Sequence, residues 1–180
     1  MKIAITGHTK GIGKAIAGLY YTDEVVGFSR SNGYDISKPE DVKSIIKNTI
    51  EIDCDVFVNN AYNNTAQTTI FDMLLKHWNS DSTKTIVNIN SRTIYNGPNQ
   101  RKYTADKKLL RSSAINAIRD INRKCRVINI NPGYVRTDMV SHVDVKMLTP
   151  EQLAAMVKWC LDQPQGIEVG ELSVWCTTLD

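Results

Sequence analysis

The chain has 180 residues, of which 42% are hydrophobic and 23% are charged, as in an ordinary globular protein. This length favours one domain over residues 1–180. The formal net charge is +3, and the basic residues are scattered among acidic ones, so nothing indicates a nucleic-acid-binding surface. The opening MKIAITG lacks the apolar core of a signal peptide, and no apolar run is long enough to span a membrane.

The cysteines show neither a CxxC pair nor the Cys/His spacing of a metal site. A free thiol is a common small residue of protein cores. The cysteines therefore favour a reduced, cytoplasmic setting and no metal. They are Cys54, Cys125, Cys160 and Cys176.

Short apolar runs predict the strands of the chain, and segments with helical periodicity lie between them. The predicted strands are residues 2–6, 24–29, 55–61, 84–91, 125–132 and 171–176. The predicted helices are residues 14–21, 37–50, 69–78, 149–163 and a helix within the run 100–121. Two of these helices begin with the spacing of a capping box, Ser37 with Glu40 and Thr149 with Gln152.

Several of the predicted strands are apolar without alternation, which is typical of strands buried on both faces. Strands of this kind that alternate with helices predict a parallel sheet with helices on each face. The predicted fold class is therefore α/β, a single-domain, doubly wound parallel sheet of the Rossmann type.

Three glycines follow the first predicted strand, in the segment ITGHTKGIGKAI. Glycine permits a tight turn and a close approach of the backbone to a ligand, and the helix N-terminus behind it suits a pyrophosphate. The spacing G-x-x-x-G-x-G of Gly7, Gly11 and Gly13 differs from the generic dinucleotide motif. A strand-to-helix turn without a ligand is the alternative, but the position favours nucleotide binding.

The second predicted strand is followed by Ser29 and Arg30, where an acidic residue would grip the ribose 2′-hydroxyl of NAD. An arginine can instead bind a 2′-phosphate in a forked geometry, and Lys10 can add a second positive charge. These residues favour NADP, or NADPH, over NAD. The alternative is that Arg30 is a solvated loop residue.

Five segments occur in order and span nearly the whole chain: TGHTKGIG, NNA at 59–61, VNINS at 87–91, YTADK at 103–107 and NPGYVRTD at 131–138. Together they resemble the short-chain dehydrogenase/reductase family. Each pattern is short, but five in sequence on the predicted elements make a specific match. The resemblance implies an oxidoreductase that transfers hydride between a nicotinamide cofactor and a small carbonyl or alcohol substrate.

The resemblance implies a catalytic set of Ser91, Tyr103, Lys107 and Asn64, with 12 residues from the serine to the tyrosine. It also implies that Asp35 and Ile36 contact the adenine, and that Pro132 to Thr137 hold the nicotinamide. The complete set expected to bind the cofactor is Gly7, Thr9, Lys10, Gly11, Ile12, Gly13, Ser29, Arg30, Asp35, Ile36, Asn60, Ala61, Tyr103, Lys107, Pro132, Gly133, Val135 and Thr137.

The residue types of the catalytic set suit the reaction. A free phenol has a pKa near ~10, too high for ready proton exchange at neutral pH. Tyr103 and Lys107 lie one helical turn apart, so the ammonium, together with a positive nicotinamide, is expected to lower the pKa of the phenol. Tyr103 would then act as general acid or base, and Ser91 would hydrogen-bond the substrate oxygen.

The chain departs from the family pattern in three places. Only residues 30–34 separate the second strand from Asp35, so the second helix must be missing and the third strand vestigial, around 33–35. NNAY replaces the usual NNAG, which places a side chain at Tyr62. Only residues 139–148 are left for the segment that forms a longer lid over the substrate in the family.

Two other functions are compatible with the sequence. A sensor or interaction protein could bind NADP(H) on this fold without turnover, although it would not need an intact catalytic set. The segment YDISKPEDV also resembles dTDP-4-dehydrorhamnose reductases, but 180 residues leave no room for their sugar-binding region. The family resemblance further implies a homodimer or homotetramer, with the helix that carries Tyr103 at the interface.

Overall fold

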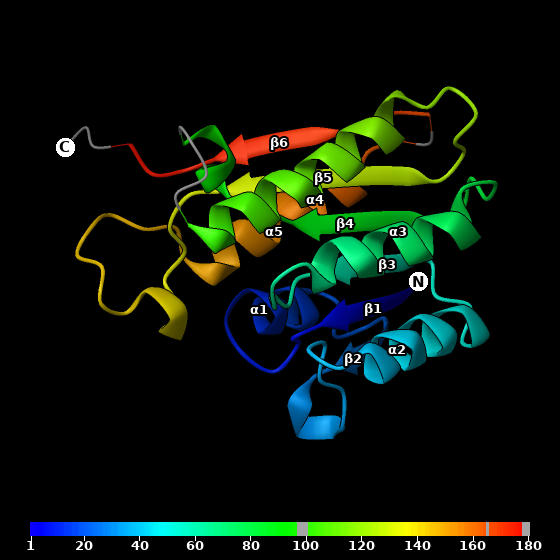
Figure 1. Cartoon of the computed structure of the whole chain (residues 1–180), viewed down its shortest axis with the longest axis horizontal. Helices are drawn as coiled ribbons and strands as arrows, with labels where there is room; N and C mark the ends of the chain where they lie inside the picture. Colours follow the sequence, from blue (N-terminus) through cyan, green and yellow to red (C-terminus); the bar gives the residue numbers. More distant parts are fainter. Residues whose placement is uncertain (97–100, 165, 178–180) are drawn as a thin grey trace.

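Six parallel strands form one sheet in the spatial order β2-β1-β3-β4-β5-β6 (Figure 1). The computed structural model describes residues 1–96, 101–164 and 166–177. The strands are β1 (Lys2–Thr6), β2 (Glu24–Phe28), β3 (Val56–Asn59), β4 (Thr85–Ile89), β5 (Arg126–Pro132) and β6 (Glu171–Val174). The strand order changes direction between β1 and β3, and in open α/β sheets ligands bind at such a switch point.

The helices are α1 (Gly11–Leu19), α2 (Pro39–Glu51), α3 (Ala66–Trp78), α4 (Lys102–Arg119) and α5 (Pro150–Leu161). Three short 3-10 helices join them to the sheet: η1 (Arg30–Asn32), η2 (Arg92–Tyr95) and η3 (Asp138–Val140). None of the helices in the described ranges combines the length and the apolar character needed to cross a membrane.

Helices cover both faces of the sheet, with α2, α3 and α4 on one face and α1 and α5 on the other (Figure 1). Successive strand residues point to opposite faces, so Ile3 and Ile5 of β1 pack with α1 and α5, whereas Ala4 packs under the other three helices. The central strands β3, β4 and β5 divide between the two cores in the same way. This explains why these strands are apolar without alternation.

The predicted doubly wound α/β fold is confirmed, and each predicted strand and helix is present with ends shifted by a few residues. The sheet ends at β2, because residues 29–38 contain only η1, turns and bends. The helix that the family pattern has directly after the second strand is missing, as predicted, and the helix that follows in this chain is α2. The reduction of the third strand is complete, since 33–35 form no strand.

One of the two predicted capping boxes is wrong. Thr149 Oγ1 accepts the N–H of Gln152 at 3.2 Å, and Gln152 Oε1 accepts the N–H of Thr149 at 2.8 Å, as predicted for α5. Ser37, however, does not cap α2, whose N-cap residue is Lys38. The Asp35 carboxylate accepts the N–H of Ser37 at 2.9 Å, which holds Ser37 in a turn before the helix begins.

The two positions provide a matched test of capping. Thr149→Ala should lower the free energy of unfolding by about 1 kcal/mol, because it leaves the N–H of Gln152 without its acceptor. Ser37→Ala removes no helix cap and should have a clearly smaller effect. Urea unfolding of both variants beside the parent checks this, and an equal loss in the two variants would contradict the assignment of the caps.

Candidate active site

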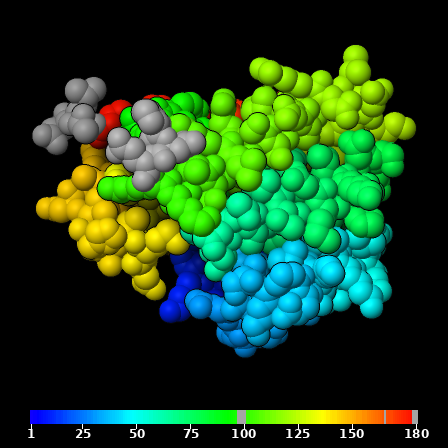
Figure 2. Space-filling view, viewed as in Figure 1, coloured from blue at the N-terminus to red at the C-terminus, as the bar shows by residue number. Residues whose placement is uncertain are grey.

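The predicted site residues come from the loops at the carboxyl ends of the parallel strands, which meet at one edge of the sheet. Figure 2 shows the surface hollowed at this edge: the dark blue of the β1–α1 turn is visible between the yellow-orange segment that follows β5 and the blue segment that follows β2. The hollow therefore has the glycine turn at its floor.

The tight glycine turn has backbone angles and close contacts that require glycine. Gly7 and Gly11 have φ of 72° and 50°, in the left-handed region that favours glycine. A Cβ on Gly13 would lie 2.2 Å from the carbonyl oxygen of Gly7, so no side chain fits there. The first turn of α1 thus packs directly on the end of β1, with its N-terminus open to the hollow.

Thr6 and Asn60, at the ends of β1 and β3, hold the turn in place. Thr6 Oγ1 accepts the N–H groups of Asn60 and Ala61 at 2.9 and 3.0 Å. The Asn60 amide donates to the carbonyl of Thr6 at 2.9 Å and to that of Gly7 at 3.4 Å. The side-chain N–H groups of Asn60 therefore bond to the protein backbone. Thr6, which the sequence analysis did not single out, helps to hold the same turn.

The segment after β2 presents Arg30 at the surface. Asn32 Oδ1 accepts the N–H of Ser29 at 2.8 Å, and Asn32 Nδ2 donates to the carbonyl of Gly27 at 2.7 Å, which fixes η1 against the end of β2. Arg30 begins η1 and is exposed. The pKa of the Asp35 carboxyl is lowered, mainly by the hydrogen bond from the Ser37 backbone and further by the Ser37 side chain.

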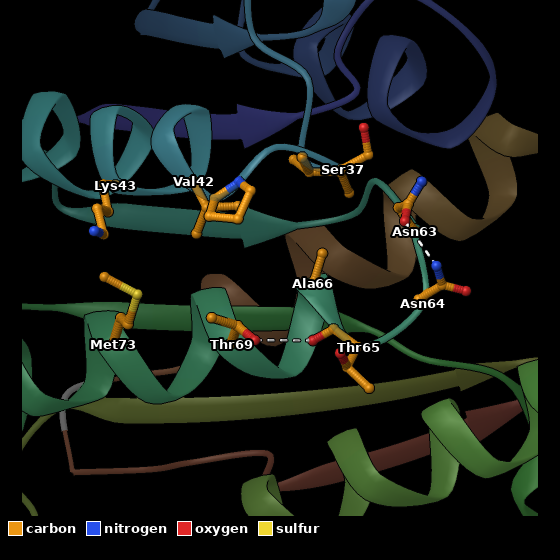
Figure 3. Close-up of a pocket in the computed structure, with 11 residues that line it drawn as sticks. Ser37, Val42, Lys43, Asn63, Asn64, Thr65, Ala66, Thr69 and Met73 are labelled. Atoms are coloured by element: carbon orange, nitrogen blue, oxygen red, sulfur yellow. Dashed lines mark hydrogen bonds between the residues drawn. The ribbon is translucent and has the colours of Figure 1, made fainter.

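A cavity of about 300 Å³ lies between the start of α2 and the start of α3 (Figure 3). Apolar side chains, Ile36, Val42 and Met73 among them, form its walls, and Asn63 and Asn64 lie at its rim. The reduced edge of the sheet opens this space, because the chain passes from β2 to α2 without a covering helix. It adjoins the place where the adenine is expected.

Ser91 and Tyr103, two members of the predicted catalytic set, lie in contact. The structure has Ser91 as the N-cap residue of η2, directly after β4, and Tyr103 in the first turn of α4. The pKa of the half-buried Tyr103 is raised, because burial disfavours the phenolate, while its hydrogen bond with Ser91 acts in the opposite direction. The expected lowering of this pKa is thus not present in the protein alone, where burial outweighs the hydrogen bond with Ser91.

Lys107, the third member, is buried at 3% exposure. Its Nζ donates to Gln67 Oε1 at 2.6 Å and to the carbonyl of Ile89 at 2.9 Å. It lies 5.6 Å from the centre of the Tyr103 ring. Burial lowers the pKa of the Lys107 ammonium to about 7, and the nearby Asp106 carboxylate raises it in part. Gln67 is a contact that the sequence analysis missed, since no short motif relates residues 40 positions apart.

Tyr62, which replaces the usual glycine, packs edge-on against Tyr103 with ring centres 4.8 Å apart and an interplanar angle of 75°. Its hydroxyl donates to Asp106 Oδ2 at 3.0 Å, and Lys102 Nζ lies 3.0 Å from the same oxygen. Burial, with the Asp106 carboxylate, raises the pKa of Tyr62 to about 12. Tyr62 therefore stays a neutral phenol and forms one wall beside Tyr103.

Asn64, the predicted fourth catalytic residue, is not part of this cluster. It is exposed, has φ of 47°, and its amide donates to Asn63 Oδ1 at 3.2 Å. Its side chain lies at the rim of the cavity of Figure 3. Among the described contacts it is Gln67, three residues further along, that reaches Lys107. The difference arises because the chain turns sharply at Asn64 before α3 begins.

The segment that starts with Pro132 leads from the end of β5 back to the glycine turn. A Cβ on Gly133 would lie 2.6 Å from Trp175 Cβ, so β6 packs closely there. Val135 and Leu148 form an isolated bridge at the base of the short segment 139–148. A Cβ on Gly11 would lie 3.0 Å from Thr137 Cγ2, which shows that Thr137 faces the start of α1.

The remaining predicted residues are at or near the hollow. Thr9 and Lys10 are exposed in the glycine turn, and Lys10 Nζ lies 3.8 Å from Asp138 Oδ2 across it. Ile12 packs against the core under α1 and α5. An ion pair this exposed contributes little stability, so Lys10 is available to another anion.

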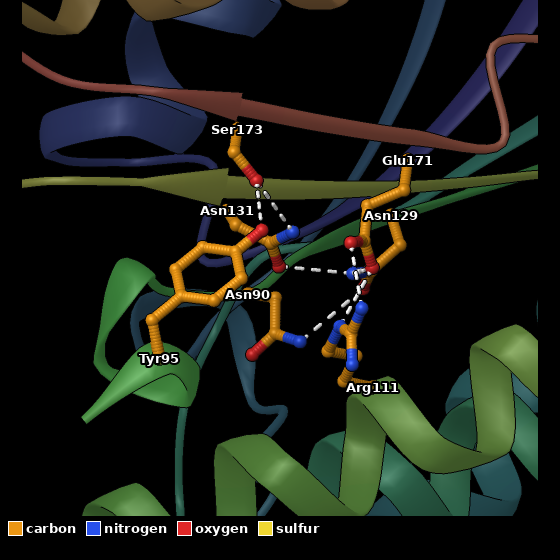
Figure 4. A network of polar contacts seen from close by, with 7 residues as sticks. All are labelled: Asn90, Tyr95, Arg111, Asn129, Asn131, Glu171 and Ser173. Atoms are coloured by element: carbon orange, nitrogen blue, oxygen red, sulfur yellow. Dashed lines mark hydrogen bonds and ion pairs between the residues drawn. The ribbon is translucent and has the colours of Figure 1, made fainter. Parts of the chain in front are cut away.

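A network of buried amides joins β5 to β6 and to the helices beside Ser91 (Figure 4). Asn129 Nδ2 donates to Asn131 Oδ1 at 2.9 Å, and Asn131 Nδ2 donates to Ser173 Oγ at 3.1 Å. At one end Arg111 of α4 pairs with Glu171 through two hydrogen bonds of 2.8 and 2.9 Å. At the other end the Tyr95 hydroxyl of η2 lies 2.6 Å from Ser173 Oγ. The network fixes η2, and with it the position of Ser91.

Comparisons with known proteins agree with this arrangement. A family model described as short chain dehydrogenase matches residues 61–148, which include Ser91, Tyr103 and Lys107. The fold is similar over the whole chain to the closed form of serine dehydrogenase complexed with NADP+, with 18% identity, a TM-score of 0.81, and coverage of 100% of this chain and 96% of that chain. Over residues 61–148 the chain is thus similar to the short-chain dehydrogenase/reductase family.

Two further solved structures have similar folds. The 3-ketoacyl-(acyl-carrier-protein) reductase from Brucella melitensis, complexed with NADH, is 22% identical with a TM-score of 0.78, over 97% of this chain and 96% of that chain. The 3-alpha-hydroxysteroid dehydrogenase from Pseudomonas sp. B-0831, also complexed with NADH, is 18% identical with a TM-score of 0.77, over 97% and 95%. A comparison with curated proteins found no match.

The buried Lys107 makes stability depend on pH in a definite direction. The pKa of Lys107 is about 7 in the folded protein, against 10.5 for an unperturbed lysine. Between these two pH values the unfolded chain therefore binds more protons than the folded protein. The free energy of unfolding should therefore rise with pH through this window. Lys107→Met should flatten the rise, and urea unfolding at about pH 7 and about pH 9.5 measures it.

The exposed Lys76 of α3 provides the control, since Lys76→Met should leave the pH dependence of the parent intact. If Lys107→Met and the parent gain the same stability over this window, Lys107 does not titrate as its burial requires.

Proposed function

We propose that the protein is an NADP-dependent oxidoreductase that transfers hydride between the nicotinamide and a small carbonyl or alcohol substrate, with Tyr103 as general acid and base. The match to the short chain dehydrogenase model supports an oxidoreductase in general. The observation that carries the finer proposal is the contact between Ser91 and Tyr103 beside the buried Lys107. Burial of an ammonium is unfavourable, and its position beside a phenol supports a role for both groups in proton transfer.

The residues present fit a dinucleotide. The glycine turn leaves the α1 N-terminus open where a side chain on Gly13 would meet the backbone, and backbone N–H groups at a helix N-terminus suit a pyrophosphate. Asn60 and Ala61 lie between this turn and α3, and Thr137 closes it from the other side. The cavity of Figure 3 adjoins the expected adenine end at Ile36.

Side chains of the protein donate and accept the proton of the reaction. When bound, the nicotinamide supplies or accepts the hydride. Ser91 is placed to hydrogen-bond the substrate oxygen as negative charge develops there. Tyr103 donates its phenolic proton to that oxygen in reduction and takes it back in oxidation. The Lys107 ammonium stabilises the phenolate that results, and it can hydrogen-bond the ribose through an N–H that Gln67 and Ile89 leave free.

The preference for NADP rests on charge. Arg30 is exposed directly after β2, and Lys10 is exposed in the glycine turn, where its ion-pair partner is Asp138 at 3.8 Å. Asp35, which lies beyond η1, has its carboxylate engaged by Ser37. The two cations, Arg30 and Lys10, favour a phosphate over a hydroxyl as the 2′-substituent. The relatives bind either cofactor, so the argument depends on these residues alone.

Tyr103→Phe should abolish turnover of NADPH with a panel of small ketones and aldehydes, a loss of at least about 100-fold, because no other proton donor replaces the phenol. The Kd of NADPH should change only a few-fold. Tyr21→Phe, at a tyrosine that is 84% exposed, is the control and should match the parent. Turnover that survives in Tyr103→Phe would sink the proposed role of this residue.

Arg30→Ala should raise the Kd of NADPH by about 10-fold or more and leave that of NADH nearly unchanged, because a charge-assisted bond to the 2′-phosphate contributes about 1.5–3 kcal/mol. Nicotinamide fluorescence with each cofactor measures both constants. Arg119→Ala, at an exposed arginine at the end of α4, should affect neither. An equal rise in the Kd of NADPH and of NADH would show that Arg30 does not distinguish the 2′-phosphate from the 2′-hydroxyl.

A further inference from the structure

The Lys107 ammonium is buried against uncharged acceptors. Two of its three N–H groups have acceptors, the Gln67 side-chain carbonyl at 2.6 Å and the Ile89 backbone carbonyl at 2.9 Å. A buried lysine that keeps its charge is usually paired with a carboxylate. Here two neutral carbonyl dipoles take that place.

The orientation of the Gln67 amide is determined by its other contacts. Gln67 is 2% exposed, and its Nε2 donates to the carbonyl of Asn59 at 2.8 Å and to that of Ile89 at 3.2 Å. Since both partners are carbonyls, the NH₂ group must face the strand ends and the oxygen must face Lys107. Gln67 thus bridges β3, β4 and α4 through one side chain.

The charged and titratable groups that face Lys107 come from two elements. From its own helix these are Tyr103, with its ring centre 5.6 Å away, and the neighbouring Asp106. From the segment after β3 it is Tyr62, with its ring centre 5.4 Å away. Asp106 is already bonded to Tyr62 and to Lys102. Among the contacts of Lys107 that the structure describes, α3 and β4 contribute the uncharged groups of Gln67 and Ile89.

We propose that Gln67 is a positioning residue that holds the Lys107 ammonium at the carboxyl end of β4 and, because it is neutral, leaves the protonation of Lys107 able to change with its surroundings. Its part in catalysis rests on the proposed function. A glutamate at the same place would pair with the ammonium and keep it protonated. An apolar side chain would remove the acceptor and favour the neutral amine.

The neutrality of Gln67 matters for the proposed proton transfer by Tyr103. A lysine that stays fully charged at every pH stabilises a phenolate on Tyr103 but cannot respond to it. A lysine near the midpoint of its titration can take a proton from solvent as the phenolate forms and return it to solvent as the phenol is restored. The lowered pKa of Lys107, about 7, is consistent with this arrangement.

The test follows the titration of Lys107 directly, in the protein without cofactor. Lysines labelled with ¹³C at Cε report protonation by NMR, and the Lys107→Met variant identifies the Lys107 signal. Gln67→Glu should move its midpoint upward by about 1 to 3 pH units, as an opposite charge in contact does. Gln67→Met, which keeps the shape of the side chain and removes its acceptor, should move the midpoint downward.

Thr68→Val is the matched control. Thr68 is the next residue of α3 and is also buried, and its hydroxyl has no hydrogen-bond partner in the described structure. Its variant should leave the midpoint of Lys107 unchanged. If Gln67→Glu moves the midpoint no further than Thr68→Val does, the inference is overturned. Gln67→Glu also keeps the test open should the Met variant fail to fold.

Turnover separates this inference from the proposed function. Because the reaction uses the ammonium, kcat/KM should fall as pH rises through the Lys107 midpoint, and Gln67→Glu should shift that fall to higher pH. A shifted midpoint in a protein that turns over no substrate would support the control of Lys107 by Gln67 and remove the proposed activity. Turnover with an unshifted pH profile and an unshifted midpoint would overturn the role of Gln67 and leave the activity in place.

Discussion

Both faces of the sheet are buried, and this constraint determines where polar chemistry can occur. Strands β1, β3, β4 and β5 supply alternate side chains to two cores, one under α1 and α5 and one under α2, α3 and α4. A polar group buried in these cores without a hydrogen-bond partner is unfavourable. The carboxyl ends of the strands, where every chain segment leaves the sheet in the same direction, are therefore the place where hydroxyls, amides and the Lys107 ammonium gather.

The elements were predictable from the sequence because their signals are local. Apolar runs gave the strands, and the Thr149 box gave the start of α5. Ser37 has the same spacing to Glu40, yet the helix begins at Pro39, because the Asp35 carboxylate competes for the N–H of Ser37. The spacing of two residues in sequence shows which hydrogen bonds they can form. Which bond forms depends on the partner that lies nearer in the fold.

The candidate site was predictable only in part, for the same reason. Ser91, Tyr103 and Lys107 belong to short motifs, and the structure brings them together. Gln67 belongs to no motif, and its contact with Lys107 joins two helices that are far apart in sequence. Asn64 shows the converse case, since its place near the start of a helix suggested a role, but the turn at its positive φ directs it to another cavity.

The burial of Tyr103 and Lys107 links their protonation to each other. Burial raises the pKa of the phenol and lowers that of the ammonium, so each group is moved toward its neutral form. A positive charge placed beside the phenol favours phenolate, and the phenolate in turn favours the ammonium. The two protons are then held by the pair rather than by either residue. A buried pair with neutral neighbours such as Gln67 and Ile89 responds strongly to such a charge, because its hydrogen-bond acceptors carry no charge and the nearby Asp106 carboxylate is bonded to Tyr62 and Lys102.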